Sequence, residues 1–156
     1  MDTLPQADIY LLLEAQYELV EQLFDHLETA AAFPAGLRRQ LITLLRDQLE
    51  NQLSAEEATF YASLAPHKSR DELLQRAQLE HEHIRRLLCE MTAMSSAGAG
   101  WNDKLKELRY IVEAHFVEEE TELFEIARSL LSAREARELA RKMQAAMTGT
   151  RPATRL

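Results

Sequence analysis

The sequence is poor in the residues that interrupt helices or cross-link a chain. It has four glycines and four prolines among 156 residues, and no run of β-branched residues suggests a strand. Its single cysteine, Cys89, excludes an internal disulfide, is typical of a reducing compartment, and is expected to be a packed thiol beside Leu87 and Leu88. Apolar runs long enough to cross a bilayer are also missing. These absences predict an all-α protein without membrane spans.

Basic residues are outnumbered by acidic ones. The chain has 18 Lys and Arg against 26 Asp and Glu, which gives a formal net charge of -8 at pH 7. Such a balance argues against nucleic acid as the main partner and against binding to a membrane surface. The first eight residues lack the basic start and the small-residue cleavage site of a signal peptide. We therefore expect a cytoplasmic protein.

Apolar residues recur at i, i+3 and i+4 spacings, which is the pattern of helices with one buried face. Pro34, Pro66 and the segment 95–100 interrupt this pattern, while Ser69 with Glu72 and Ser132 with Glu135 form capping boxes that start new helices. We expect four long helices over about residues 5–32, 37–64, 70–94 and 101–131, and a short fifth helix over about 133–147.

Four long helices with short connections predict an antiparallel, up-down-up-down four-helix bundle. A chain of this length is large enough to bury one core, so we treat residues 1–156 as a single domain. The tail from about residue 148 to 156 has no apolar pattern and is expected to be flexible.

Polar residues interrupt the inner stripe of each long helix. His115 and Glu119, four residues apart, leave the same face of the fourth helix, within an apolar stripe that includes Leu108, Val112 and Ile126. In an antiparallel bundle, residues equally far from a shared turn lie at the same height, because each residue rises about 1.5 Å. This rule brings one set of inward polar residues to one level: Tyr17, Gln52, Glu56, His81, His115 and Glu119. Buried imidazoles and carboxylates are costly unless satisfied, and a metal ion satisfies both.

Three motifs resemble those of the hemerythrin-like HHE cation-binding family. They are Gln52-x-x-x-Glu56-Glu57-x-x-Phe60-Tyr61, Glu80-His81-x-x-Ile84, and His115-x-x-x-Glu119-Glu120-x-Glu122-Leu123-Phe124 after Trp101. The resemblance extends from Asp8 to about Met147. It implies a four-helix bundle that holds a non-haem di-iron centre, and functions in binding O₂ or NO, in sensing iron or oxygen, or in limited peroxide chemistry.

Two positions depart from the family pattern. Tyr17 stands where the family has a histidine on the first helix, and Gln52 stands where a histidine opens the second-helix motif. The resemblance implies that both losses fall on one metal, while the other half of the site keeps Glu56, His81, His115 and Glu119. We therefore expect one ion bound well, or two bound unequally, with iron as the metal and Zn or Mn as alternatives.

Tyr17 and Gln52 have a simpler interpretation than weak metal ligation. Tyr17 is expected to be a core tyrosine whose hydroxyl bonds Glu56 or Gln52, and Gln52 is expected to be a hydrogen-bond partner, because an amide oxygen is a poor ligand for iron. At the level of function, two alternatives remain beside the ligand-binding or metal-handling protein. One is a metal-free bundle that acts as an interaction or regulatory module, and the other is a small redox enzyme that consumes peroxide. A homodimer is compatible with each of them.

Overall fold

The computed structural model describes residues 7–30, 34–67 and 71–149. Within these ranges the chain is helical apart from short turns, and it contains no strand. The helical elements, in chain order, are α1 (Ile9–Thr29), α2 (Ala35–Glu56), η2 (Glu57–Tyr61), α3 (Ala62–Leu64), α4 (Asp71–Ala93), α5 (Ala99–Glu118), η4 (Glu119–Leu123), α6 (Phe124–Leu130) and α7 (Ala133–Gly149). The elements η2 and η4 are single π-helical turns inside the second and fourth long helices.

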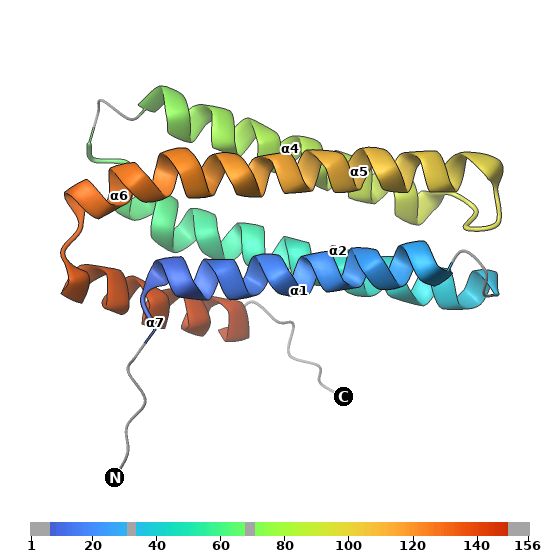
Figure 1. Cartoon of the computed structure of the whole chain (residues 1–156), viewed down its shortest axis with the longest axis horizontal. Coiled ribbons are helices and arrows are strands. Elements are labelled where there is room, and N and C mark those ends of the chain that lie inside the picture. The colour runs from blue at the N-terminus through green and yellow to red at the C-terminus, as the bar shows by residue number, and fades with distance from the viewer. Residues whose placement is uncertain (1–6, 31–33, 68–70, 150–156) are drawn as a thin grey trace, which may run out of the picture.

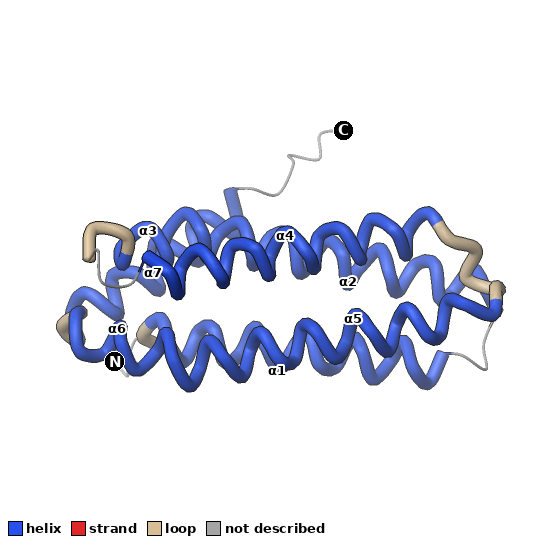
Figure 2. The backbone as a smooth tube through the Cα atoms, turned by 90° about the horizontal axis from the view of Figure 1, so that it is seen from above, coloured by secondary structure: helices blue, strands red, loops and turns tan. Residues whose placement is uncertain are grey.

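Four long helices lie side by side, each antiparallel to the next (Figure 1). α1 and α4 each pack against both α2 and α5, which closes the bundle (Figure 2). The fifth helix, α7, lies outside the bundle against α1, α2 and η2. This arrangement confirms the predicted bundle with its short C-terminal helix. None of the described helices is long and apolar enough to span a membrane.

The helix ends agree in part with the capping signals. α1 starts at Ile9, where the Asp8 side chain accepts a hydrogen bond from the backbone N–H of Leu11 at 2.9 Å. The capping box before α7 is present, with Ser132 and Glu135 bonding each other's backbone N–H at 2.8 and 3.0 Å. Residues 5–6 and 31–32 of the predicted first helix, the Ser69 cap and most of the predicted flexible tail lie outside the described residues, while Ala7 and Asp8 precede the helix.

The predicted inner stripes form the core. Their buried apolar members include Leu13, Phe24, Leu45, Ile84 and Val112, and the polar members at the shared level are also buried. Cys89 was predicted to be packed, but it is exposed. Leu87 and Leu88 take the buried positions, and one further residue turns about 100° around a helix, which carries Cys89 to the outer face of α4.

The π-turn η4 changes which residues of the fourth long helix are buried after it. The sequence pattern placed Ile126 inward, but Ile126 is half-buried, whereas Phe124 and Ala127 are buried. A π-helical turn contains an additional residue, so the positions that follow η4 are rotated relative to an uninterrupted α-helix. Phe124 then packs against Tyr10 and Phe60 in an aromatic cluster with ring centroids 5.1 to 6.3 Å apart. This cluster fills the core next to the polar level, which is the height in the bundle at which Tyr17, Gln52, Glu56, His81, His115 and Glu119 lie.

Candidate metal centre

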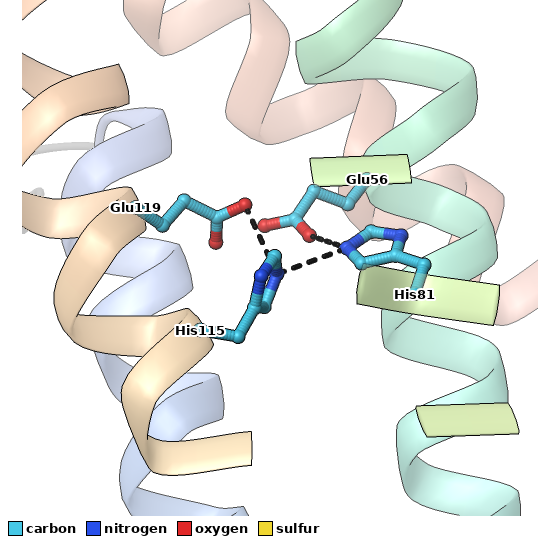
Figure 3. Close-up of side chains that lie close together, drawn as sticks. All are labelled: Glu56, His81, His115 and Glu119. Atoms are coloured by element: carbon cyan, nitrogen blue, oxygen red, sulfur yellow. Dashed lines mark hydrogen bonds and ion pairs between the residues drawn. The ribbon is translucent and has the colours of Figure 1, made fainter. Parts of the chain in front are cut away.

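Four buried side chains converge at the polar level of the bundle. Glu56 comes from the end of α2, His81 from the middle of α4, His115 from α5 and Glu119 from the first position of η4 (Figure 3). Each is at most 3% exposed, and one ligand atom from each lies within 4.8 Å of the others. The four residues that the sequence pattern predicted as one intact half-site are therefore close neighbours.

The two imidazoles point the same nitrogen toward each other. Nε2 of His81 lies 3.0 Å from Nε2 of His115, and it also lies 3.2 Å from Oε1 of Glu56. Nε2 of His115 lies 3.6 Å from Oε2 of Glu119. Two ring nitrogens and two carboxylates thus face one small volume in the core.

The outer nitrogens of the imidazoles are held by carboxylates that the sequence analysis had not assigned to the site. Nδ1 of His81 lies 2.6 Å from Glu57, and Nδ1 of His115 lies 2.5 Å from Glu80. A carboxylate accepts, so each Nδ1 carries the proton and each Nε2 presents a lone pair to the centre. Metal-binding histidines are commonly oriented in this way.

Arg85 keeps Glu57 ionised. Its guanidinium binds both Glu57 oxygens, at 3.0 and 3.2 Å, and also contacts Glu50 at 3.0 Å. Burial alone would raise the pKa of Glu57, but the hydrogen bonds from His81 and Arg85 outweigh it and lower the pKa to about 2. At neutral pH Glu57 is therefore an acceptor, which supports the tautomer assigned to His81.

The two central carboxylates have the opposite electrostatic environment. Burial raises the pKa of Glu56 to about 7, and burial together with the charge of Glu56 raises the pKa of Glu119 to about 8. Within the described part of the chain, neither oxygen of Glu56 makes a hydrogen bond of good geometry, although the carboxyl lies beside Nε2 of His81, Glu119 and the Tyr61 hydroxyl. Buried carboxylate oxygens held this loosely beside two imidazole lone pairs are the donor set that a divalent or trivalent cation would satisfy.

Two tyrosines hold Glu119 in place. The hydroxyl of Tyr17 donates to Oε1 of Glu119, and the hydroxyl of Tyr61 donates to Oε2. The sequence analysis predicted Glu56 or Gln52 as the partner of Tyr17, and that prediction is wrong. Tyr17 stacks on Phe116 of α5, with ring centroids 4.1 Å apart, and this packing directs its hydroxyl toward the residues that follow on the same helix.

Gln52 lies one helical turn before Glu56 and is fully buried. Among the described residues, neither its amide oxygen nor its amide nitrogen has a hydrogen-bond partner. The prediction that Gln52 bonds a neighbouring side chain is therefore not met. A buried primary amide without partners is unfavourable, so Gln52 is the second place at this level where a polar group lacks a partner.

Tyr61 is the functional candidate that periodicity missed. It lies five residues after Glu56, which in an uninterrupted α-helix would turn it about 140° away from that side chain. The π-turn η2 spans these residues and brings both side chains to the centre, with the Tyr61 hydroxyl 3.1 Å from Nε2 of His81. π-turns of this kind are frequent at functional sites, but no residue pattern in the sequence marks one in advance.

One comparison with known proteins identifies a family, and another finds a solved structure with the same fold. Residues 8–127 match the family described as Hemerythrin HHE cation binding domain. The chain is also similar in structure to a hemerythrin HHE cation-binding domain-containing protein from Mycobacterium kansasii. That match has a TM-score of 0.79 and 21% sequence identity, and covers 92% of this chain and 86% of the other. No curated protein sequence matches the chain. With most of its length matched by the family, the chain belongs to the hemerythrin HHE cation-binding domain family.

Proposed function

We propose that the chain binds non-haem iron at the centre formed by Glu56, His81, His115 and Glu119. One observation carries this proposal. The Nε2 atoms of His81 and His115, each of which presents a lone pair, lie 3.0 Å apart in a buried site. Two such lone pairs repel unless a cation lies between them or beside both. A proton could bridge the two nitrogens, but it would not bind the carboxylates at the same time, whereas a metal ion could bind nitrogen and carboxylate together.

Two nitrogen and two carboxylate donors suit iron, manganese or zinc. We favour iron because carboxylate and histidine side chains projecting into a helical bundle are the usual ligands of non-haem iron in this architecture. A second ion, held more weakly, would lie toward Tyr17 and Gln52. These residues offer oxygen atoms where the family pattern has imidazoles, so we expect unequal occupancy of the two positions.

Bound iron would supply an open coordination position for a small ligand such as O₂ or NO, or for peroxide. The protein supplies the rest of the chemistry. Glu57 and Glu80 hold both imidazoles with Nε2 inward, and Tyr17 and Tyr61 fix the orientation of Glu119. The aromatic cluster next to the polar level excludes water, which strengthens every electrostatic interaction in the site. Ligand binding, sensing and metal handling are the functions compatible with this arrangement.

Elemental analysis tests the proposal directly. Protein reconstituted with Fe(II) without oxygen and then desalted should contain about one tightly bound iron per chain. His115→Ala should lose this iron, while His26→Ala, which removes an exposed imidazole of α1, should retain it. A wild-type protein that folds and binds no iron, zinc or manganese would contradict the proposal.

That negative result would favour a metal-free bundle acting as an interaction or regulatory module. One observation supports this second candidate: Glu119 and the outer nitrogens of both imidazoles already have partners within the protein. In such a protein the polar level would be a structural network. Its disruption should then lower stability to the same extent whether or not metal is present.

A further inference from the structure

The hydroxyl of Tyr61 lies inside the candidate centre rather than beside it. It is 3.1 Å from Nε2 of His81 on α4, donates to Oε2 of Glu119 on η4 and also interacts with the Glu56 carboxyl, so it reaches three of the four candidate ligands. The ring is 2% exposed and stacks on the His81 ring, with centroids 5.2 Å apart and planes 24° apart. Burial and stacking on His81 therefore fix where this hydroxyl points.

Tyr61 has one proton and three acceptors within reach, because its hydroxyl also interacts with the Glu56 carboxyl. If His81 gives its Nε2 lone pair to a metal ion, the carboxylates of Glu56 and Glu119 are the remaining acceptors. Glu119 does not depend on Tyr61 alone, because Tyr17 donates to its other oxygen. If the Tyr61 hydroxyl turned its proton away from Glu119, Tyr17 would still donate a hydrogen bond to that carboxylate.

We propose that Tyr61 is the residue that recognises small anions at the centre, by donating its hydroxyl proton to an anion bound next to His81. This inference rests on the proposed function, since it requires a metal ion to hold the anion. The hydroxyl lies 3.1 Å from Nε2 of His81, so it is within reach of a group bound beside that nitrogen. Hydrogen bonds to charged acceptors are stronger than those to neutral ones, so the phenol favours anions over neutral diatomic ligands.

Azide is a suitable probe anion and NO a suitable neutral probe. We expect Tyr61→Phe to weaken azide binding by roughly 10- to 100-fold, the range for loss of one hydrogen bond to a charged group, with NO binding much less affected. Azide affinity is measured by optical titration of the ferric protein and NO affinity by titration of the ferrous protein, with wild type and variant compared at equal iron content. Tyr10→Phe is the matched control, because it removes another buried phenol hydroxyl that, among the described residues, has no hydrogen-bond partner.

Tyr17→Phe separates anion recognition from indirect effects through Glu119. Both tyrosines bond this carboxylate, but within the described residues only the Tyr61 hydroxyl also lies at hydrogen-bond distance from an imidazole. If Tyr61 acts only by positioning Glu119, the two variants should lose azide affinity equally and should lose NO affinity in the same proportion. That result would overturn the inference. Selective loss of azide in Tyr61→Phe alone would support it.

A second substitution covers the case in which Tyr61→Phe loses iron or unfolds. Placing 3-fluorotyrosine at position 61 keeps the shape of the side chain and makes the phenol a stronger donor, so azide should bind more tightly than in the wild type. Unchanged azide affinity would contradict the inference. Absence of iron from the wild-type protein would instead contradict the proposed function, so the two failures can be told apart.

Discussion

Glu57 accepts a hydrogen bond from Nδ1 of His81 at 2.6 Å and is itself bound by both terminal nitrogens of Arg85. The corresponding carboxylate of the other imidazole, Glu80, lies next to a second carboxylate, Glu118. Burial would raise the pKa of Glu80, but its hydrogen bond with His115 contributes to lowering it. Both imidazoles are thus oriented by ionised carboxylates. The carboxylate that orients His81 is itself anchored by the guanidinium of Arg85.

Neutralising either carboxylate should weaken metal binding. Glu57→Gln and Glu80→Gln each keep an oxygen that can accept from Nδ1, but they remove the negative charge that makes Nε2 a stronger donor. We expect metal affinity to fall by roughly 10-fold or more in each variant, as is typical for such partners of metal-binding histidines. Competition with a chromogenic chelator measures the change.

Glu50→Gln is the control for this prediction. Glu50 also binds Arg85, at 3.0 Å, and is exposed without contacting either imidazole within the described structure. Its substitution should leave metal affinity close to that of the wild type. If all three variants weaken binding equally, the effect would come from the net charge of the protein and not from the orientation of the imidazoles.

The stability of the metal-free protein should fall as pH rises from about 5 to 8. Glu56 and Glu119 have pKa values raised from 4.5 to about 7 and about 8, mainly by burial, so the folded state holds more protons than the unfolded state in this window. The lowered pKa of Glu57 has the opposite effect, but that effect operates below pH 4.5. One unit of pKa shift corresponds to about 1.4 kcal/mol, so the decrease should be easily measured.

Urea denaturation of metal-free protein at several pH values tests this prediction. Glu119→Gln should flatten the pH dependence, because an amide does not titrate. Metal-loaded protein should show the reverse trend, with stability increasing over the same range, since the ion binds carboxylates only after they lose their protons. A metal-free protein whose stability rises from pH 5 to pH 8 would show that these two carboxyls are not the dominant titrating groups.

Helix periodicity was enough to predict the bundle and the level at which four donors meet. Glu56, His81 and His115 lie in α-helices, and Glu119 directly follows α5 at the first position of η4, so the 3.6-residue repeat holds up to each of them. The repeat fails after each π-turn. Two residues therefore face the core although an uninterrupted α-helix would point them away from it. They are Tyr61 at the end of η2 and Phe124 directly after η4.

The partner of Tyr17 was predicted wrongly for a different reason. The height of a residue in the bundle follows from its distance to a turn, but the choice between neighbours at that height depends on how two helices are rotated against each other. Stacking of Tyr17 on Phe116 sets this rotation for α1 and α5. Aromatic packing between helices distant in sequence leaves no periodic signal in a single chain.

Removal of either imidazole should destabilise the metal-loaded protein more than the metal-free protein. A ligand that binds the folded state alone adds stability that grows with its concentration, about 4 kcal/mol at 1,000 times its dissociation constant. His81→Ala and His115→Ala should therefore lower the melting temperature of loaded protein strongly and that of metal-free protein much less. Equal losses in both forms, measured by thermal unfolding, would mean that the imidazoles are structural.

Gln52→Leu should stabilise the metal-free protein. Gln52 is fully buried, and its amide has no hydrogen-bond partner among the described residues, so it carries a desolvation penalty of about 1–3 kcal/mol. Leucine has a similar size and no polar atom to satisfy. An increase in the free energy of unfolding, measured with urea, would support this account, while a decrease would mean that the amide has a partner in solution.

Restoring the two family histidines should build a second strong metal position. Tyr17 already contacts Glu119, and Gln52 lies one turn from Glu56, so both substituted side chains start next to carboxylates that could bind two ions. The double substitution Tyr17→His with Gln52→His would add two imidazoles of the type that the family pattern has there. We expect iron content to rise from about one toward two ions per chain, measured by elemental analysis after reconstitution.

Tyr17→Phe with Gln52→Leu is the matched control, since it changes the same positions and removes both oxygen donors, and it should not exceed about one ion. A folded double-histidine variant with unchanged iron content would show that residues 17 and 52 do not face the centre in the manner that the family pattern implies.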